Sequence, residues 1–419
     1  VSFETKPPIS IMLGARVGND LAILHLVKEL SEIAKAAQHV EKLGNKQDKG
    51  IEDKVITLLS NLKEAPESEF NQIVKNDKVL DKLFFTVDSP YTSDIDDAIA
   101  IEVDHSKNQV KLFVAIADVS SYVKPDDKQD FHAKEQCSSF YLANKTIHML
   151  DKKLAENFCS LNVGEARSSM VCELTYTIDS NELVDSQFYQ AQITSKARLT
   201  YDDVDRIING VQPQESFIFK NAIKEKFNNI EQFKEISVAL ENLRQFTEKN
   251  KRINERNYWI IDTPEYVLGE DGKVDHLTYR DENVLSQKMV ETSMLAANIA
   301  AGQFLDKHYP NMGLFRNQNE PGEGERPKPA TYGNESLGHW GLKTQFYTHF
   351  TSPIRRYCDL MVHRLIKNVI KPENQKQFTS DEMKNIVEQI NIQQYKAKQN
   401  DMKAYDLLLS VSRSALRNV

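Results

Sequence analysis

This 419-residue sequence lacks long hydrophobic runs, a secretion signal and paired cysteines. No apolar run approaches the ~20 residues that a transmembrane helix needs. No basic stretch ahead of a small-residue cleavage site marks a signal peptide. The four cysteines are spread through the chain without any C-x-x-C pair, which argues against a zinc site. We therefore expect free, buried thiols in a reducing cytoplasm and no association with a membrane.

The sequence also lacks the basic balance that non-specific nucleic-acid binders usually have. It holds 53 Lys and Arg against 61 Asp and Glu, for a net charge of −8. Residues 351–419 have the opposite balance, with 12 Lys and Arg against 7 Asp and Glu. An acidic pocket beside a basic channel would give this asymmetry. The hydrophobic fraction of 40% is typical of a soluble globular protein.

Residues 84–100 carry four carboxylates between two apolar stretches. The four are Asp88, Asp94, Asp96 and Asp97. Leu83–Val87 and Ile99–Val103 have the β-branched and aromatic content of strands, so we expect the aspartates on the loop between them. Like charges this close raise each other's pKa unless a cation neutralises them, and oxygen ligands select Mg²⁺, Mn²⁺ or Ca²⁺. A solvated acidic turn is the alternative, whereas an EF-hand is excluded because its central Gly and closing Glu are missing.

The run Thr86–Ala98 (T-V-D-S-x-x-x-x-D-x-D-D-A) resembles the metal-binding motif of the ribonuclease II / ribonuclease R family, the RNB exoribonucleases. His349–Tyr357 (H-F-T-S-P-I-R-R-Y) resembles that family's arginine-bearing segment. The two matches occur in the family's order, which makes the resemblance specific. It implies an α+β catalytic domain over residues 81–419, with a mixed β-sheet flanked by helices. Residues 1–80 would form an N-terminal module, either a truncated OB-type RNA-binding barrel or a substitute for one.

The resemblance implies processive 3′-to-5′ hydrolysis of single-stranded RNA to 5′-nucleoside monophosphates, with the four aspartates holding Mg²⁺ or Mn²⁺. We assign the first and last aspartate to one ion, and the middle two to completing its shell or orienting the attacking water. Arg355 is expected to bind the scissile phosphate as a planar bidentate donor, with Arg356 as the alternative. A non-catalytic RNA-binding protein on the same fold remains the second hypothesis. We expect a monomer with no obligate protein partner.

Tyr141 lies in a segment that resembles the family's Tyr-Leu-Pro stretch, whose tyrosine stacks on the 3′ end of RNA. Stacking on an aromatic ring is worth ~1–3 kcal/mol per base and tolerates any sequence. The alternative is that Tyr141 belongs to the core. Three family prolines of this segment are replaced here, by Ala143, His148 and Asp151.

Three further residues are carried over from the resemblance as RNA contacts. Glu291 would accept a hydrogen bond from a ribose hydroxyl, which is one way to prefer RNA over DNA. The alternative for Glu291 is an ion pair in a buried network. Trp259 would supply a second stacking surface. Ser352 would cap a helix beginning near Pro353 and aim its N-terminus at phosphate.

Periodicity predicts the remaining elements. Strands are expected over 98–103, 110–116, 170–178 and 191–199, and helices over 222–250, 283–305, 357–370 and 381–409. Lys196 and Arg198 share one face of a strand and would contact RNA phosphates or solvent. Asp118 would be a metal ligand or the cap of a turn. Between Arg316 and Thr331 the family has a long helical insertion, so either the protein lacks it or the sequence omits residues there.

Overall fold

The protein is described here from a computed structural model. The described residues are 64–67, 69–70, 72–76, 78–90, 92–141, 146–210, 226–227, 229–250, 253, 255–257, 264–268, 274–279, 284–373 and 375–396.

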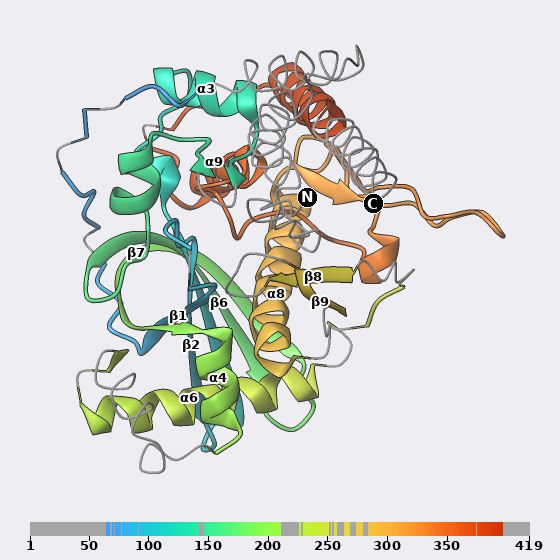
Figure 1. Cartoon of the computed structure of the whole chain (residues 1–419). Coiled ribbons are helices and arrows are strands. Elements are labelled where there is room, and N and C mark those ends of the chain that lie inside the picture. The colour runs from blue at the N-terminus through green and yellow to red at the C-terminus, as the bar shows by residue number, and fades with distance from the viewer. Residues whose placement is uncertain are drawn as a thin grey trace, which may run out of the picture.

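A closed five-stranded barrel in the order β1-β2-β3-β6-β7 forms the centre of the molecule (Figure 1). Neighbouring strands are antiparallel except β1 and β7, which run parallel, so the expected mixed sheet is confirmed. The strands are β1 (Phe84–Asp88), β2 (Asp97–Asp104), β3 (Gln109–Ala117), β6 (Ala166–Thr177) and β7 (Leu183–Thr200). β7 is the longest strand, and Figure 1 shows it curling around the barrel to meet β1.

The barrel strands form where apolar residues match the two-residue period of a strand. From Ala191 to Leu199, β7 alternates buried and half-buried positions because one face points into the core. β2 and β3 form the hairpin expected from the sequence, in register from Asp97–Ile116 to Asp104–Gln109. Its turn ends at Asn108, whose φ of +53° lies in the left-handed region that asparagine tolerates.

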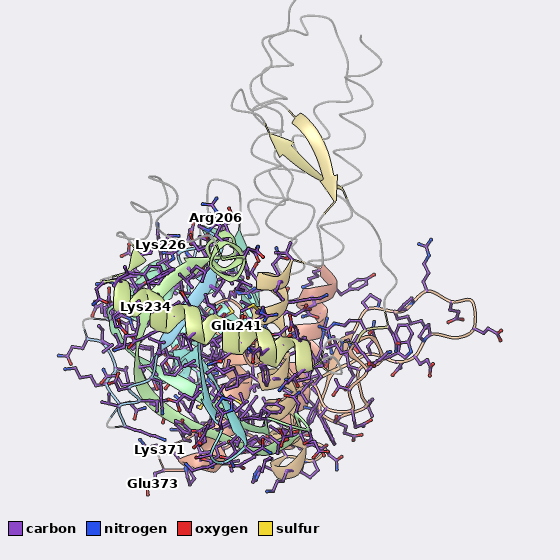
Figure 2. The ribbon with its side chains drawn as sticks, turned by 90° about the horizontal axis from the view of Figure 1, so that it is seen from below. Arg206, Lys226, Lys234, Glu241, Lys371 and Glu373 are labelled. Atoms are coloured by element: carbon purple, nitrogen blue, oxygen red, sulfur yellow. The ribbon has the colours of Figure 1, made fainter. Side chains whose placement is uncertain are left out.

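Helices cover the barrel on two sides. They are α3 (Lys128–Gln136), α4 (Tyr201–Ile208), α6 (Ile230–Lys249), α8 (Leu285–His308) and α9 (Tyr357–Ile370). α8 packs against β3, β6 and α9, and α9 also packs against β7. Figure 2 views the molecule from below and shows α6 on this lower face, with Lys234 and Glu241 on the surface of the helix. Within the described residues, no helix is both long and apolar enough to cross a membrane.

Short elements connect these parts. They are the strands β4 (Phe140–Tyr141), β5 (Thr146–Ile147), β8 (Pro264–Leu268), β9 (Val274–Tyr279), β10 (Phe315–Asn317) and β11 (Thr331–Gly333), the 3-10 turns η1 (Val119–Ser121) and η3 (Trp340–Leu342), and the π turn η2 (Leu154–Phe158). β10 pairs with β11 across the stretch where the family insertion was expected.

The sequence-based helix predictions are confirmed for 357–370 and, within a few residues at either end, for 283–305. Of the helix predicted over 222–250, α6 forms the part from Ile230 to Lys249. Residues 380–396 are helical, and the rest of the helix predicted up to residue 409 lies outside the described residues.

Candidate active site

The four aspartates lie at the end of the barrel where β1 connects to β2. Asp88 is the last residue of β1 and Asp97 is the first residue of β2, so the expectation that all four lie on a loop is wrong for these two. Asp94 and Asp96 are in the connection, and both side chains are buried. Between them, Ile95 is buried and its backbone N–H donates to the Ser160 hydroxyl at 3.1 Å. The connection is therefore held in place by the core.

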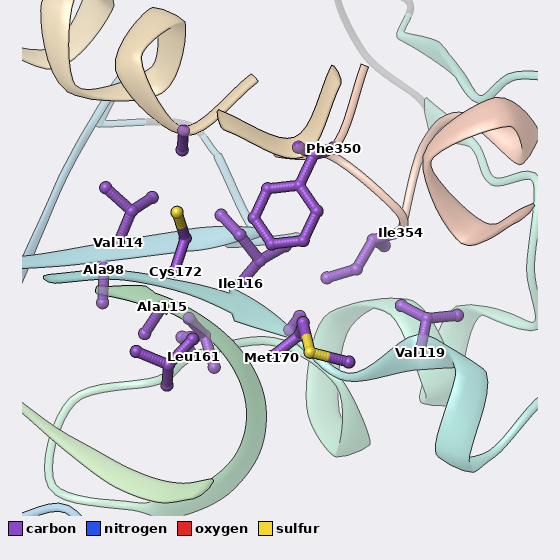
Figure 3. Packing of buried hydrophobic residues seen from close by; sticks show 14 of the residues in the cluster. Ala98, Val114, Ala115, Ile116, Val119, Leu161, Met170, Cys172, Phe350 and Ile354 are labelled. Atoms are coloured by element: carbon purple, nitrogen blue, oxygen red, sulfur yellow. The ribbon is translucent and has the colours of Figure 1, made fainter. Parts of the chain in front are cut away.

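The arginine-bearing segment meets the aspartates directly. The backbone N–H of Ile354 donates to Asp96 Oδ1 at 2.8 Å, and Arg355 Nε donates to Asp96 Oδ2 at 3.2 Å. Figure 3 shows the side chains of Phe350 and Ile354 pointing into the buried cluster that includes Ile116 from the barrel. This packing fixes the segment, so Arg355 reaches the aspartates from 259 residues further along the chain.

Burial and mutual repulsion raise the pKa values of these carboxyl groups. Burial, followed by the charge of Asp97, raises the pKa of Asp88 to about 8, although Arg198 and Arg355 oppose this. Burial raises the pKa of Asp97 to about 6 against the effect of Arg355. The pKa of Asp96 is also raised well above its usual value by burial, despite Arg355. A bound cation would relieve all three groups.

The donor set fits a hard divalent cation. Asp88 Oδ2 is buried without a hydrogen-bond partner among the described residues, so it has a lone pair to offer. No three of the four aspartates bring carboxylate oxygens within 4.8 Å of one another, so side chains must move if three or more of them bind one ion. His349, Cys358 and Asp359 do reach that spacing. However, the Cys358 thiol donates to Asp359 Oδ2 at 3.1 Å, and Asp359 Oδ1 accepts from Arg356, so that group is already satisfied internally.

Ser352 and Arg356 precede α9 and bond to neighbouring side chains. α9 begins at Tyr357, its N-cap is Arg356, and no side chain caps it, so a helix capped by Ser352 near Pro353 is wrong. The reason is that Arg356 forms an isolated antiparallel bridge with Ser138 and is extended. The Ser352 hydroxyl instead accepts from Arg355 Nη2 at 2.9 Å, while Arg356 is turned inward to Asp359 at 2.8 Å.

The predicted stacking residues are only partly described. The backbone of Tyr141 belongs to β4, two residues after Ser139, whose N–H donates to the carbonyl of Arg355 at 3.0 Å. The backbone of Tyr141 is therefore close in sequence to a contact with the site, but its side chain lies outside the described residues, as does all of Trp259.

Glu291 lies on α8, with its side chain 46% exposed and 2.9 Å from the Arg256 guanidinium. Asn298 lies seven residues further along the same face of α8. Its side chain accepts from the N–H of Phe350, in the arginine-bearing segment, at 2.8 Å. Seven residues are about two turns, or roughly 10 Å of helix. Glu291 is ion-paired, as in the alternative for it, but only the Arg256 side chain of the pair is buried, at 4% exposure.

Three charged residues outside the predicted set of site residues have roles that were left open or missed. Arg198 donates to the carbonyl of Thr92 in the acidic connection. Its neighbour on the same strand face, Lys196, forms a 3.3 Å ion pair with Asp81 instead. Asp118 is the N-cap residue of η1, as one of its two alternatives proposed, although its side chain makes no capping bond to the backbone; that side chain is buried in an ion pair with Lys367. The alternation of β7 indicated the face of Arg198, but the parallel pairing of Thr86 with Arg198 could not be seen from the sequence.

Comparison with known proteins agrees with this geometry. The family model for the RNB domain matches residues 77–326 and 326–372. Ribonuclease R of Chlamydia pneumoniae is 33% identical over 333 residues, covering 72% of this chain and 49% of that protein. The chain belongs to the RNB-domain family. This RNB domain spans about half the length of the curated relatives it matches.

Solved structures show the same fold for this RNB domain. Mycoplasma genitalium RNase R in complex with ribose-methylated single-stranded RNA superposes with a TM-score of 0.72 at 22% identity, covering 89% of this chain and 66% of that one. The complex of the same enzyme with double-stranded RNA gives a TM-score of 0.70 at 22% identity, covering 88% of this chain and 74% of that one. The expected α+β RNB fold is therefore confirmed.

Proposed function

We propose that this RNB domain is a metal-dependent 3′-to-5′ exoribonuclease that hydrolyses single-stranded RNA to 5′-nucleoside monophosphates. The observation that carries the proposal is the contact of Arg355 and the Ile354 N–H with Asp96, beside carboxylates whose pKa values are raised. Curated relatives are ribonuclease R, and one solved relative is in complex with ribose-methylated single-stranded RNA.

In the proposed reaction, the oxygen of a water molecule bonds to the phosphorus of the last phosphodiester. The bond from phosphorus to the 3′ oxygen breaks, so the shortened RNA keeps a 3′-hydroxyl and a 5′-monophosphate leaves. Mg²⁺ or Mn²⁺, held by the four aspartates, would polarise the phosphate and lower the pKa of the water. Asp96 orients that water, and Arg355 neutralises the charge that develops on the phosphate oxygens.

The arrangement of Arg355 suits this role. Its side chain is 27% exposed, while Nε and Nη2 are engaged by Asp96 and Ser352. These bonds fix the plane of the guanidinium before substrate arrives, which reduces the entropy lost on binding phosphate. We further propose that Tyr141 and Glu291 hold the last nucleotides, by base stacking and by a bond to a ribose hydroxyl.

We also propose that the protein acts as a monomer in the cytoplasm. Within the described residues the four cysteines are free and buried, which suits a reducing compartment.

End-labelled RNA tests the proposal. A 3′-tailed duplex should be shortened from its 3′ end, with mononucleotides present from the first time point, and a chelator should stop the reaction. Asp96→Asn should lower the cleavage rate by ~10²–10³ but keep RNA binding, whereas Asp185→Asn on the exposed part of β7 should change neither. Internal cuts in a circular RNA would exclude an exonuclease. Binding without cleavage by the parent protein would favour the non-catalytic alternative.

A further inference from the structure

His148 lies beside the aspartates in a position that their proposed role does not use. It follows β5 directly and its side chain is 4% exposed. The carbonyl of His148 accepts from the Gln136 side chain at 3.3 Å, and the next N–H, of Met149, donates to the Ser139 hydroxyl at 2.9 Å. The backbone on both sides of the ring is therefore fixed.

One nitrogen of the ring is bound to a carboxylate. His148 Nε2 is 3.0 Å from Glu156 Oε1, and the same oxygen accepts from the Ser93 hydroxyl at 3.0 Å. Burial tends to raise the pKa of Glu156, but the hydrogen bonds to His148 and Ser93 outweigh it and lower the pKa. An ionised Glu156 accepts only, so Nε2 is the donor to it, and Nδ1 is the ring nitrogen that a cation could bind.

The other nitrogen faces the site. His148 Nδ1 is buried, has no hydrogen-bond partner among the described residues, and lies 4.0 Å from Asp94 Oδ2. A lone pair opposite a carboxylate oxygen is unfavourable unless a positive group lies between them. Metal bonds are about 2.0–2.1 Å to histidine nitrogen and about 2.0–2.2 Å to carboxylate oxygen, so the two together span up to about 4.3 Å. A cation therefore fits between these two atoms.

We propose that His148 is a nitrogen ligand of the divalent cation at the aspartates, sharing it with Asp94. The inference rests on the proposed metal-dependent function and names one more ligand. Glu156 takes the place of the carboxylate that usually orients a metal-binding histidine through its second nitrogen. A mixed nitrogen and oxygen set favours a first-row transition ion such as Mn²⁺ over Mg²⁺, which prefers oxygen alone.

Pulsed electron paramagnetic resonance of the full chain with bound Mn²⁺ tests this directly, because imidazole nitrogen bound to Mn²⁺ gives ¹⁴N modulations. The parent protein should show them and His148→Gln should not. His105→Gln, at an exposed turn, should keep them. Calorimetric titration should show Mn²⁺ affinity falling about tenfold or more in His148→Gln. Mg²⁺ affinity should fall less than that, since Gln keeps an oxygen donor.

The outcomes separate this inference from the proposed function. Mn²⁺ that binds to the parent protein without ¹⁴N modulations would overturn the histidine ligand and leave the metal-dependent nuclease standing. Modulations that persist in His148→Gln would also overturn it. If Asp88→Asn weakens the binding of neither Mn²⁺ nor Mg²⁺, the proposed function fails as well. Thermal melting of each variant shows that the protein tested is folded.

Discussion

The clearest test of the site is Asp96→Asn, because both oxygens of this buried carboxylate have a donor. Asp96 Oδ1 accepts from the Ile354 N–H at 2.8 Å, and Oδ2 accepts from Arg355 Nε at 3.2 Å. Asparagine keeps only one oxygen, so its amide must point a donor at one of these two donors. The variant removes a negative charge from the site and disturbs the position of Arg355 at the same time.

The expected loss of rate follows from these contacts. A hydrogen bond to a charged group is worth about 1.5–3 kcal/mol, and a preorganised charge partner typically contributes ~10²–10³ in rate. We expect the single-turnover rate of 3′-labelled RNA cleavage to fall by ~10²–10³. Fluorescence anisotropy should show RNA binding within a few-fold of the parent. A variant that keeps more than about a tenth of the parent rate, a barrier change below ~1.4 kcal/mol, refutes the assignment.

Asp118→Asn is the matched control, since Asp118 is also a buried aspartate and directly follows barrel strand β3. Its ion pair with Lys367 holds its pKa well below the usual range, against the effect of burial. Removing one partner of a buried pair costs about 3–5 kcal/mol, so urea denaturation should show a large loss of stability. The pKa of Asp96 is raised instead, so neutralising it should change the free energy of unfolding much less. Equal stability losses would contradict this difference.

The pKa values of Asp88 and Asp97 are raised in the native state, to about 8 and about 6, so without metal the native state binds more protons than the unfolded state. The free energy of unfolding in urea should therefore fall as the pH rises from ~4 to ~8. The slope should be up to ~1.4 kcal/mol per pH unit for each group. Mg²⁺ should restore more stability at pH 8 than at pH 6, and an equal effect would argue against binding by these groups. Arg355→Lys keeps the charge but loses the planar fork, so kcat should fall ~10–100-fold with little change in RNA affinity. Glu291→Gln should lower the ratio of RNA to DNA cleavage about tenfold, measured with matched oligonucleotides. Gly302→Ala should cost ~1–3 kcal/mol in urea denaturation, because its Cβ would lie 2.8 Å from the backbone nitrogen of Tyr347.

The sequence predicted what depends on short stretches of chain. The β2–β3 hairpin and α9 were found because their apolar periodicity and their turn residues lie within 10 to 20 residues of each other. Closure of the barrel by β1 and β7 was not predicted, because Phe85 pairs with Ala197 across a separation that no local pattern reports. The sequence also identified His148 as a departure from the family, but not its distance to Asp94.

The Ser352 prediction was wrong for a related reason. Thr351, Ser352 and Pro353 have the local chemistry of a helix start, and local chemistry alone gives a helix there. A bridge to Ser138, more than 200 residues earlier, keeps Arg356 extended and delays the helix. Tertiary contacts decided the local conformation at this point.

The separation of 258 residues between Asp96 and Ile354 also has a consequence for the cell that makes this protein. Ribosomes add about 5–20 residues per second, so the aspartates are synthesised about 13–50 s before the segment that completes their surroundings. During that interval the nascent chain holds the acidic half of the site without Arg355. We expect it to be unable to cut the messenger and ribosomal RNA that surround it. Dividing the site between distant parts of the chain thus delays the proposed nuclease activity until Arg355 has been translated.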